Sequence, residues 1–260
     1  VQAPYGYVLD ETPVYFDVTE DNSTEESGVT VVKVDKPNMA QKGTITVEKT
    51  GEVFFGVSVI GGVDESGNEL PTIYQPQYEK RGLPGAVYEI IAAEDIITQD
   101  GTVRNHKGEV VDTVTTDATG TAVSRELYLG KYEVREITAP HGMVLNPEPH
   151  CVELVYAGQN VAVTETATSF ENERQKVEIS LVKSIEQNEC FGIGTNGEMK
   201  NISLGLFAAE EIVSASGTSI PANGLVEIIS LNEDGTAKIK TDLPFGSYYV
   251  QELATDSHYK

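Results

Sequence analysis

The stretch ELYLGKYEVREI, residues 126–137, recurs as DLPFGSYYVQEL at residues 242–253, and this repetition decides the fold. Both stretches alternate apolar and polar residues, which is typical of a strand with one buried face. Further segments repeat in the same order and at nearly the same spacing: AAEDI (92–96) with AAEEI (208–212), and TGTA (119–122) with DGTA (234–237). The chain therefore carries internal repeats, and these define its organisation more clearly than any single element does.

Further matches between segments predict that the chain consists of three parts. VEISLVK (177–183) echoes TITVEK (44–49), and APYGYVL (3–9) matches APHGMVL (139–145). We therefore expect the C-terminal part of a preceding repeat plus a linker, a complete repeat, and a repeat that lacks its last strand, over residues 1–42, 43–174 and 175–260. The complete repeat has an insertion of about 18 residues, which we place in the polar stretch 56–81.

The rest of the sequence is also typical of strands. Runs such as GTITVEKTG (43–51) alternate with period two, and turn-forming clusters such as DESGN (64–68) and NEDG (232–235) separate them. Convincing amphipathic helices are scarce. The sequence predicts an all-β protein.

Composition excludes several functions. The 260 residues hold 41 acidic and 18 basic side chains, and the formal charge of −23 repels phosphates and anionic lipids, so no nucleic acid is expected as a partner. No apolar run approaches the ~20 residues of a membrane helix, so no membrane insertion is expected. Cys151 and Cys190 fit no disulfide framework or zinc spacing, and we predict neither a metal nor a cofactor.

Three polar residues interrupt the apolar rows of the complete repeat. One strand face reads Ile45, Val47, Lys49, and two others end in Glu136 and Asn172. Because side chains on a strand alternate between faces, each of the three polar residues continues a row that points into the core. A buried Lys or Glu is costly unless it is paired or neutralised, so the three residues call for a shared explanation.

These elements resemble the Cna B-type repeats (SpaA-like pilin domains) of Gram-positive surface proteins. The resemblance covers most of the chain, and its segments keep the same order in both copies. The matching segments are ITVEKTG (45–51), LPGAVYEI (83–90), TTDATGTA (115–122), YEVREITAPHGMVL (132–145), FEN (170–172), SLVK (180–183), GLFAAEE (205–211) and GSYYVQEL (246–253). The resemblance implies tandem Greek-key β-sandwiches of transthyretin/prealbumin-like architecture.

The resemblance also implies an intramolecular isopeptide bond. By position, Lys49 would be the nucleophile, Asn172 the acceptor and Glu136 the acid that shuttles protons. Burial favours a neutral lysine amine and a protonated Glu136, which this reaction needs. The alternative is a buried Lys49–Glu136 ion pair without a covalent bond. Either way there is no turnover, so the chain is not expected to be an enzyme.

The flanking copies carry equivalents of these residues. Lys183 and Glu252 correspond to the lysine and the acid in the third part, with an acceptor for Lys183 outside the chain. In the first part, Asp35 lies in a DKP segment and is the preferred acceptor for an upstream lysine. Asn38 is the alternative, because its spacing to Lys49 equals the spacing from Asn172 to Lys183.

The resemblance implies a structural stalk or shaft of an adhesin or pilin: extracellular, and attached to the cell wall by sortase anchoring outside this sequence. Neighbouring repeats of the same protein would be its partners. The alternative is a module that binds a host matrix protein or glycan, and an accessory domain of a carbohydrate-active enzyme is a weaker third. An apolar or aromatic groove in the stretch 56–81 would favour binding, whereas a disordered polar loop would favour a spacer.

Other candidate sites are weaker. Scattered acidic pairs could serve a glycosidase, but 41 acidic residues make chance pairs common. His150 and Cys151 are adjacent on a strand and so point to opposite faces, which disfavours a nucleophilic pair. Lys80 lies in a poor match to a sortase-linkage motif. The turn acids form no EF-hand loop, and solvated turns are expected for Asp64, Glu65, Glu233 and Asp234.

Overall fold

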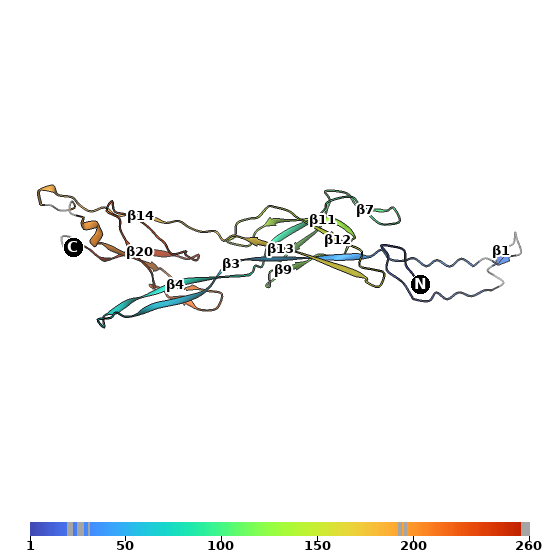
Figure 1. The fold of residues 1–260 in the computed structure, drawn as a ribbon, viewed down its shortest axis with the longest axis horizontal. Helices are drawn as coiled ribbons and strands as arrows, with labels where there is room; N and C mark the ends of the chain where they lie inside the picture. Colours follow the sequence, from blue (N-terminus) through green and yellow to red (C-terminus); the bar gives the residue numbers. More distant parts are fainter. Residues whose placement is uncertain (20–22, 25–28, 31, 192–193, 195–196, 256–260) are drawn as a thin grey trace. The chain divides into compact units, whose positions relative to one another are not determined.

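The computed structural model describes residues 1–19, 23–24, 29–30, 32–191, 194 and 197–255 (Figure 1). Apart from two short 3₁₀ helices, η2 (Glu189–Phe191) and η3 (Glu198–Asn201), the regular structure of these residues is β-strand, so the all-β prediction is confirmed. The chain forms two compact units. The first unit is Val1–Thr50 with Gly82–Asn172, and the second is Gly51–Arg81 with Glu173–Lys260.

The first unit consists of two groups of paired strands. One is the antiparallel sheet β12–β11–β5–β8, and in the other β3 pairs with β9, β10 and β13. The hairpin of β6 and β7 follows β5. The bounds are β3 (Lys42–Val63), β5 (Val87–Ala92), β6 (Ile96–Ile97), β7 (Val103–Asn105), β8 (Val110–Thr115), β9 (Thr121–Val123), β10 (Leu127–Tyr128), β11 (Gly130–Thr138), β12 (His150–Leu154) and β13 (Val163–Asn172).

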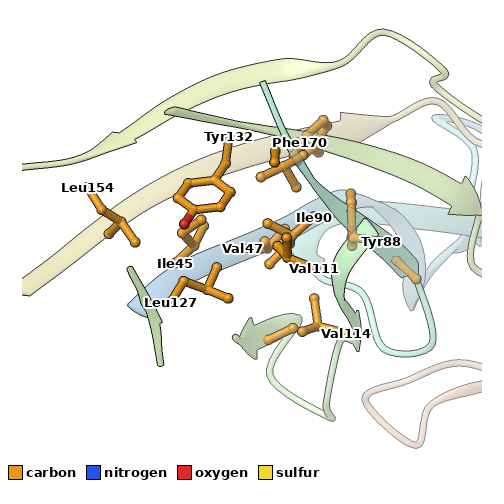
Figure 2. Close-up of a cluster of buried hydrophobic side chains, with 14 of the residues drawn as sticks. Ile45, Val47, Tyr88, Ile90, Val111, Val114, Leu127, Tyr132, Leu154 and Phe170 are labelled. Atoms are coloured by element: carbon orange, nitrogen blue, oxygen red, sulfur yellow. The ribbon is translucent and has the colours of Figure 1, made fainter. Parts of the chain in front are cut away.

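The core of the first unit follows directly from the alternation. Figure 2 shows Ile45 and Val47 of β3 in the same cluster as Ile90 of β5 and Tyr132 of β11. All four are fully buried. Each apolar side chain of this size contributes about 1.5–3 kcal/mol when it leaves water, so the inward rows are enough to hold the two groups of strands together.

The second unit repeats this pairing scheme. Its strands β18, β15 and β20 form one sheet in that order, β14 pairs with β19, and β16 pairs with β17. The bounds are β14 (Ser180–Val182), β15 (Ser203–Ala208), β16 (Ile212–Val213), β17 (Ser219–Ile220), β18 (Leu225–Ser230), β19 (Thr236–Lys238) and β20 (Tyr248–Ala254). A separate core fills this unit, built around residues such as Leu206, Ile220 and Val226.

Equivalent turns approach the two lysine strands. The Lys49 N–H donates to the Gly120 carbonyl at 2.7 Å, and the Lys183 N–H donates to the Gly235 carbonyl at 2.9 Å. Both glycines have a positive φ, and a Cβ at either one would collide with the carbonyl oxygen of its lysine. The glycines of TTDATGTA and NEDGTA are therefore required for the turn and for the close approach of the lysine strand.

Residues 51–81 lie with the second unit, which differs from the repeat boundaries that the sequence predicts. β3 continues past Thr50 and returns as β4 (Glu69–Gly82). β4 pairs with β18 in parallel through Ile73 and Leu225. The stretch is thus not the disordered polar loop that was one of the two outcomes considered from the sequence. It is an ordered hairpin of the second unit.

Side chains and backbone both fix this hairpin. Phe54, Val57 and Tyr74 pack against the core of the second unit. The Phe54 carbonyl accepts a hydrogen bond from the Ala215 N–H at 3.0 Å. An apolar face that would otherwise meet water is covered in this way, so residues far apart in sequence share one core.

The described residues of the N-terminal segment form one short strand pair and one bridge. β1 (Ser23–Thr24) and β2 (Val29–Thr30) form a two-stranded pair, and parts of the predicted first region, 1–42, lie outside the described residues. Tyr7 and Ala40 form an isolated bridge. Within the described ranges, no helix has the length and apolar character needed to cross a membrane.

Candidate cross-linking site

Lys49, Glu136 and Asn172 meet in the core of the first unit. They lie on β3, β11 and β13, and each follows an apolar neighbour two residues earlier on the same face: Val47, Val134 and Phe170. Lys49 and Glu136 are each 1% exposed and Asn172 is 2% exposed. The burial that the alternation predicts is therefore confirmed at all three positions, and the structure brings the three side chains together.

The contacts join the three residues into one cluster. Lys49 Nζ lies 3.0 Å from Glu136 Oε1 and donates a short hydrogen bond to Asn172 Oδ1. Asn172 Nδ2 donates to Glu136 Oε1 at 2.9 Å. The amine thus lies against the carboxamide that it would attack, and the carboxyl group lies against the nitrogen that would leave.

Burial dominates the electrostatics of the amine. Loss of water around Lys49 lowers its pKa, because the charged form is disfavoured in the core, while the Glu136 carboxylate opposes this shift. Two aromatic rings enclose the amine, with Nζ at 5.9 Å from the centre of Tyr88 and 5.8 Å from that of Phe170. The neutral, nucleophilic form of the amine is therefore more favoured at Lys49 than at an exposed lysine.

Sequence reasoning missed two groups beside Glu136. The backbone N–H of Asn146 donates to Glu136 Oε2 at 3.0 Å, which fixes the second carboxyl oxygen. Tyr88 lies directly across from Glu136 in the register of β5 and β11. A backbone donor from a loop leaves no side-chain pattern to find. Tyr88, however, stands in the inward row of LPGAVYEI, and its hydroxyl in an apolar row was a detectable signal.

The second unit holds the equivalent pair in a different environment. Lys183 Nζ lies 2.9 Å from Glu252 Oε2, and the two side chains are 34% and 33% exposed. The hydrogen bond from Lys183 lowers the pKa of Glu252. A groove of about 480 Å³ beside the pair is lined by Ile185, Ile202 and Leu253 among others. Among the described residues, β14 pairs only with β19, so no strand stands where β13 stands in the first unit.

The candidate acceptors of the N-terminal segment are away from any such cluster. Asp35 is exposed and forms an ion pair with Lys33 at 3.4 Å. Asn38 is half-buried and lies outside the strands. The structure brings neither of them to Lys49, and their roles as acceptors for an upstream lysine stay predictions.

The remaining candidates have structural explanations. The His150 ring stacks on Phe170 at 3.9 Å and its Nδ1 lies 2.9 Å from Thr168 Oγ1, whereas Cys151 is exposed and unpaired as a thiol. Asp64 and Asp234 accept hydrogen bonds from the backbone of their own turns. In the described part of the chain, no group of three metal-binding side chains is found.

A comparison with protein families matches one segment of the chain, most of which lies in the first unit. Residues 75–169 match the family model described as "SpaA: Prealbumin-like fold domain". This segment is similar to a SpaA-type prealbumin-like domain. The resemblance to Cna B-type and SpaA-like repeats is thereby confirmed, together with the prealbumin-like fold. The matched range of the SpaA-type domain includes Glu136 and Tyr88, but it begins after Lys49 and ends before Asn172.

Solved structures give more distant similarities. The Bacillus anthracis TIE protein is 18% identical, with a TM-score of 0.41, over 84% of this chain and 46% of its own. The streptococcal ancillary pilin is 17% identical, with a TM-score of 0.31, over 91% and 61%. The shaft pilin SpaA from Lactobacillus rhamnosus GG is 12% identical, with a TM-score of 0.30, over 85% and 90%. No curated protein sequence matches the chain.

Proposed function

We propose that this chain is part of the shaft or stalk of a pilin-type surface protein, and that an isopeptide bond between Lys49 and Asn172 stabilises its SpaA-type domain. The family match supports the structural, non-enzymatic role. The fully buried contact among Lys49, Glu136 and Asn172 is the observation that carries the proposal. Extracellular location, cell-wall attachment through sortase anchoring and association with neighbouring repeats follow from this role.

The proposed reaction is a single acyl transfer. Lys49 first gives a proton to Glu136, and the neutral Nζ attacks Cγ of Asn172. The new C–N bond forms as the bond from Cγ to Nδ2 breaks. Two protons pass in turn from Nζ through Glu136 to Nδ2, one before and one after the attack, so the leaving nitrogen departs as protonated ammonia, Glu136 returns to the carboxylate and no other reactant is needed. Because the fold holds the groups in contact, a reaction that is slow in water becomes feasible once per molecule.

The amide orientation refines the role of Glu136. An acid at this position has two possible tasks: it can polarise the Asn172 carbonyl, and it can move protons to the leaving ammonia. In the structure, Nδ2 and not Oδ1 faces Glu136, while Oδ1 faces Lys49. This arrangement supports the second of the two steps, the delivery of a proton to the leaving nitrogen.

The bond would change how the chain carries tension. Lys49 and Asn172 are 123 residues apart, and a covalent link between them takes every residue in between out of the path of a pulling force. A shaft needs this property, because it must not lengthen under load. The hairpin 51–81 packs as part of the fold of the second unit, which gives no support to the alternative of a ligand-binding insertion.

Pulling single molecules from their two ends tests this function. With the bond, the segment between Lys49 and Asn172 contributes no length. Without it, complete unfolding releases an additional length of roughly 400 Å, at about 3.3–3.6 Å per residue. The Glu136→Gln variant keeps the side-chain volume but loses the acid, and it should show the longer extension. Equal extension of both proteins at the longer value would contradict the proposal.

A further inference from the structure

Tyr88 carries a buried hydroxyl that the proposed reaction has not used. The residue is 0% exposed, its ring packs against Phe170 at 4.8 Å between centres, and its hydroxyl makes no hydrogen bond of normal geometry within the described chain. An unsatisfied buried hydroxyl destabilises the fold, because the group has lost its water partners and gained no other. Such a group in a folded core calls for an explanation, because a phenylalanine would pack equally well without this cost.

The position of Tyr88 points to Glu136. The two residues are direct partners in the antiparallel register of β5 and β11, and both point into the core. Burial raises the pKa of Tyr88, and the neighbouring Glu136 carboxylate raises it further. The hydroxyl therefore stays protonated and available as a donor next to the carboxyl group.

The second unit provides an internal comparison. There Glu252 is paired in the register of β15 and β20 with Leu204, the residue equivalent to Tyr88. Leucine has the bulk to fill the core but no donor. The hydroxyl thus occurs beside the acid that completes a buried cluster, and it is missing beside the acid that forms only a half-exposed ion pair.

We propose that Tyr88 is a positioning residue for the cross-linking reaction, whose hydroxyl donates a hydrogen bond to the Glu136 carboxyl group as ammonia leaves. This inference rests on the proposed function and names a further residue of the same site. Before reaction, Glu136 Oε1 forms an ion pair with Lys49 Nζ and accepts a hydrogen bond from Asn172 Nδ2. Glu136 Oε2 accepts a hydrogen bond from the Asn146 N–H. When Nδ2 leaves and Nζ is acylated, the Glu136 carboxyl group loses one neighbouring hydrogen-bond donor and one neighbouring positive charge.

The hydroxyl of Tyr88 is the unused donor nearest in register to compensate this loss. It transfers no proton itself, so the balance of the reaction is unchanged. A hydrogen bond to a charged group typically contributes about 1.5–3 kcal/mol, and its loss would slow the reaction by roughly tenfold or more. Because the bond favours the carboxylate over the acid, its loss should also move the acid limb of the rate profile to higher pH. The other ionisable groups around the site are Lys49, His150 and Glu171.

The test compares the full chain with the Tyr88→Phe variant. Both are isolated in denaturant before cross-linking, refolded by dilution over a series of pH values, and followed by intact-mass spectrometry for the loss of one ammonia. Rates are taken after circular dichroism shows that refolding is complete, so slow folding is not counted as slow chemistry. Tyr132→Phe is the matched control, because Tyr132 is also fully buried but donates its hydroxyl to the Tyr128 carbonyl at 2.6 Å.

The expected result is a roughly tenfold slower reaction for Tyr88→Phe, with its acid limb at higher pH, while Tyr132→Phe follows the parent chain. An unchanged or faster rate for Tyr88→Phe, with an unchanged profile, overturns the inference and leaves the proposed function standing. Failure of the parent chain to lose ammonia, or loss of ammonia by Glu136→Gln at the parent rate, overturns the proposed function instead.

Discussion

The two units place the same lysine and glutamate on equivalent strands, yet they give these residues different surroundings. In the first unit β13 pairs with β3, Asn172 joins Lys49 and Glu136, and all three are almost fully buried. In the second unit Lys183 and Glu252 form a simple ion pair, about one third exposed, beside an open groove. Under the proposed function, the pair alone does not make a reactive site. A covering strand must remove water and supply the acceptor.

The units also differ in how they complete their cores. The first unit uses strands of its own repeat throughout. The second unit uses the hairpin 51–81, which belongs in sequence to the preceding repeat. The comparison therefore predicts that the first unit depends on its buried cluster and that the second depends on the hairpin.

The largest expected effect is that of Lys49→Met. This change removes the proposed cross-link, and losing a covalent link that closes a long loop typically costs about 2–5 kcal/mol. Chemical denaturation of the parent and the variant, followed by circular dichroism, measures the difference. Lys183→Met is the matched control in the second unit, and an equal loss of stability from both variants would break the comparison.

The hairpin should be the next most sensitive region. Phe54 is half-buried against the second core, so Phe54→Ala should destabilise that unit by about 2 kcal/mol, less than for a fully buried ring. Hydrogen exchange should become faster in β15 and β18 and stay unchanged in β5 and β11. The control is Val59→Ala, since Val59 is 61% exposed on the same hairpin. Faster exchange in β5 alone would show that the hairpin serves the first unit.

A pH effect should follow from Tyr78 on β4. Burial raises the pKa of Tyr78 to about 12, and the nearby Arg174 only partly offsets this. A group with a raised folded pKa stabilises the fold below its unfolded pKa, which is about 10 for tyrosine. The second unit should therefore lose stability as pH rises from about 10 to about 12. Thermal unfolding should show a smaller loss in Tyr78→Phe, and an identical loss in both proteins would exclude Tyr78 as the cause.

The smallest effect is expected for the exposed pair. Lys183→Met should change the unfolding free energy by about 1 kcal/mol or less, because water screens the interaction. The lowered pKa of Glu252 gives a contribution that is present above the unfolded pKa of about 4.3 and is lost as the pH falls below it. Urea denaturation with and without added salt measures both effects. A loss of several kcal/mol would mean that the pair is buried in solution.

Much of the first unit could be predicted from the sequence. Period-two alternation fixes which side chains point inward, and it alone is enough to place Lys49, Glu136 and Asn172 in the core. The same alternation also predicts an inward pair at Lys183 and Glu252. It could not predict their exposure, because burial requires a neighbouring strand as well as the right face.

Alternation could not predict the packing of the hairpin or the backbone contact of Glu136 with Asn146. Residues 51–81 contain enough polar positions to resemble an exposed insertion, and their packing partners lie more than a hundred residues away. The Asn146 N–H reaches Glu136 through the path of a loop, which no side-chain pattern encodes. Pairing between distant segments depends on the whole fold, whereas the direction in which a side chain points depends only on its own strand.

Intact-mass spectrometry of the folded chain tests the central claim most directly. We expect a mass lower than that of the sequence by one ammonia, together with a branched peptide that joins Lys49 to Asn172 after proteolysis. Glu136→Gln should have the full mass of its sequence. A parent chain that keeps the full mass after prolonged incubation, with Lys49 and Asn172 recovered in separate peptides, would contradict the account.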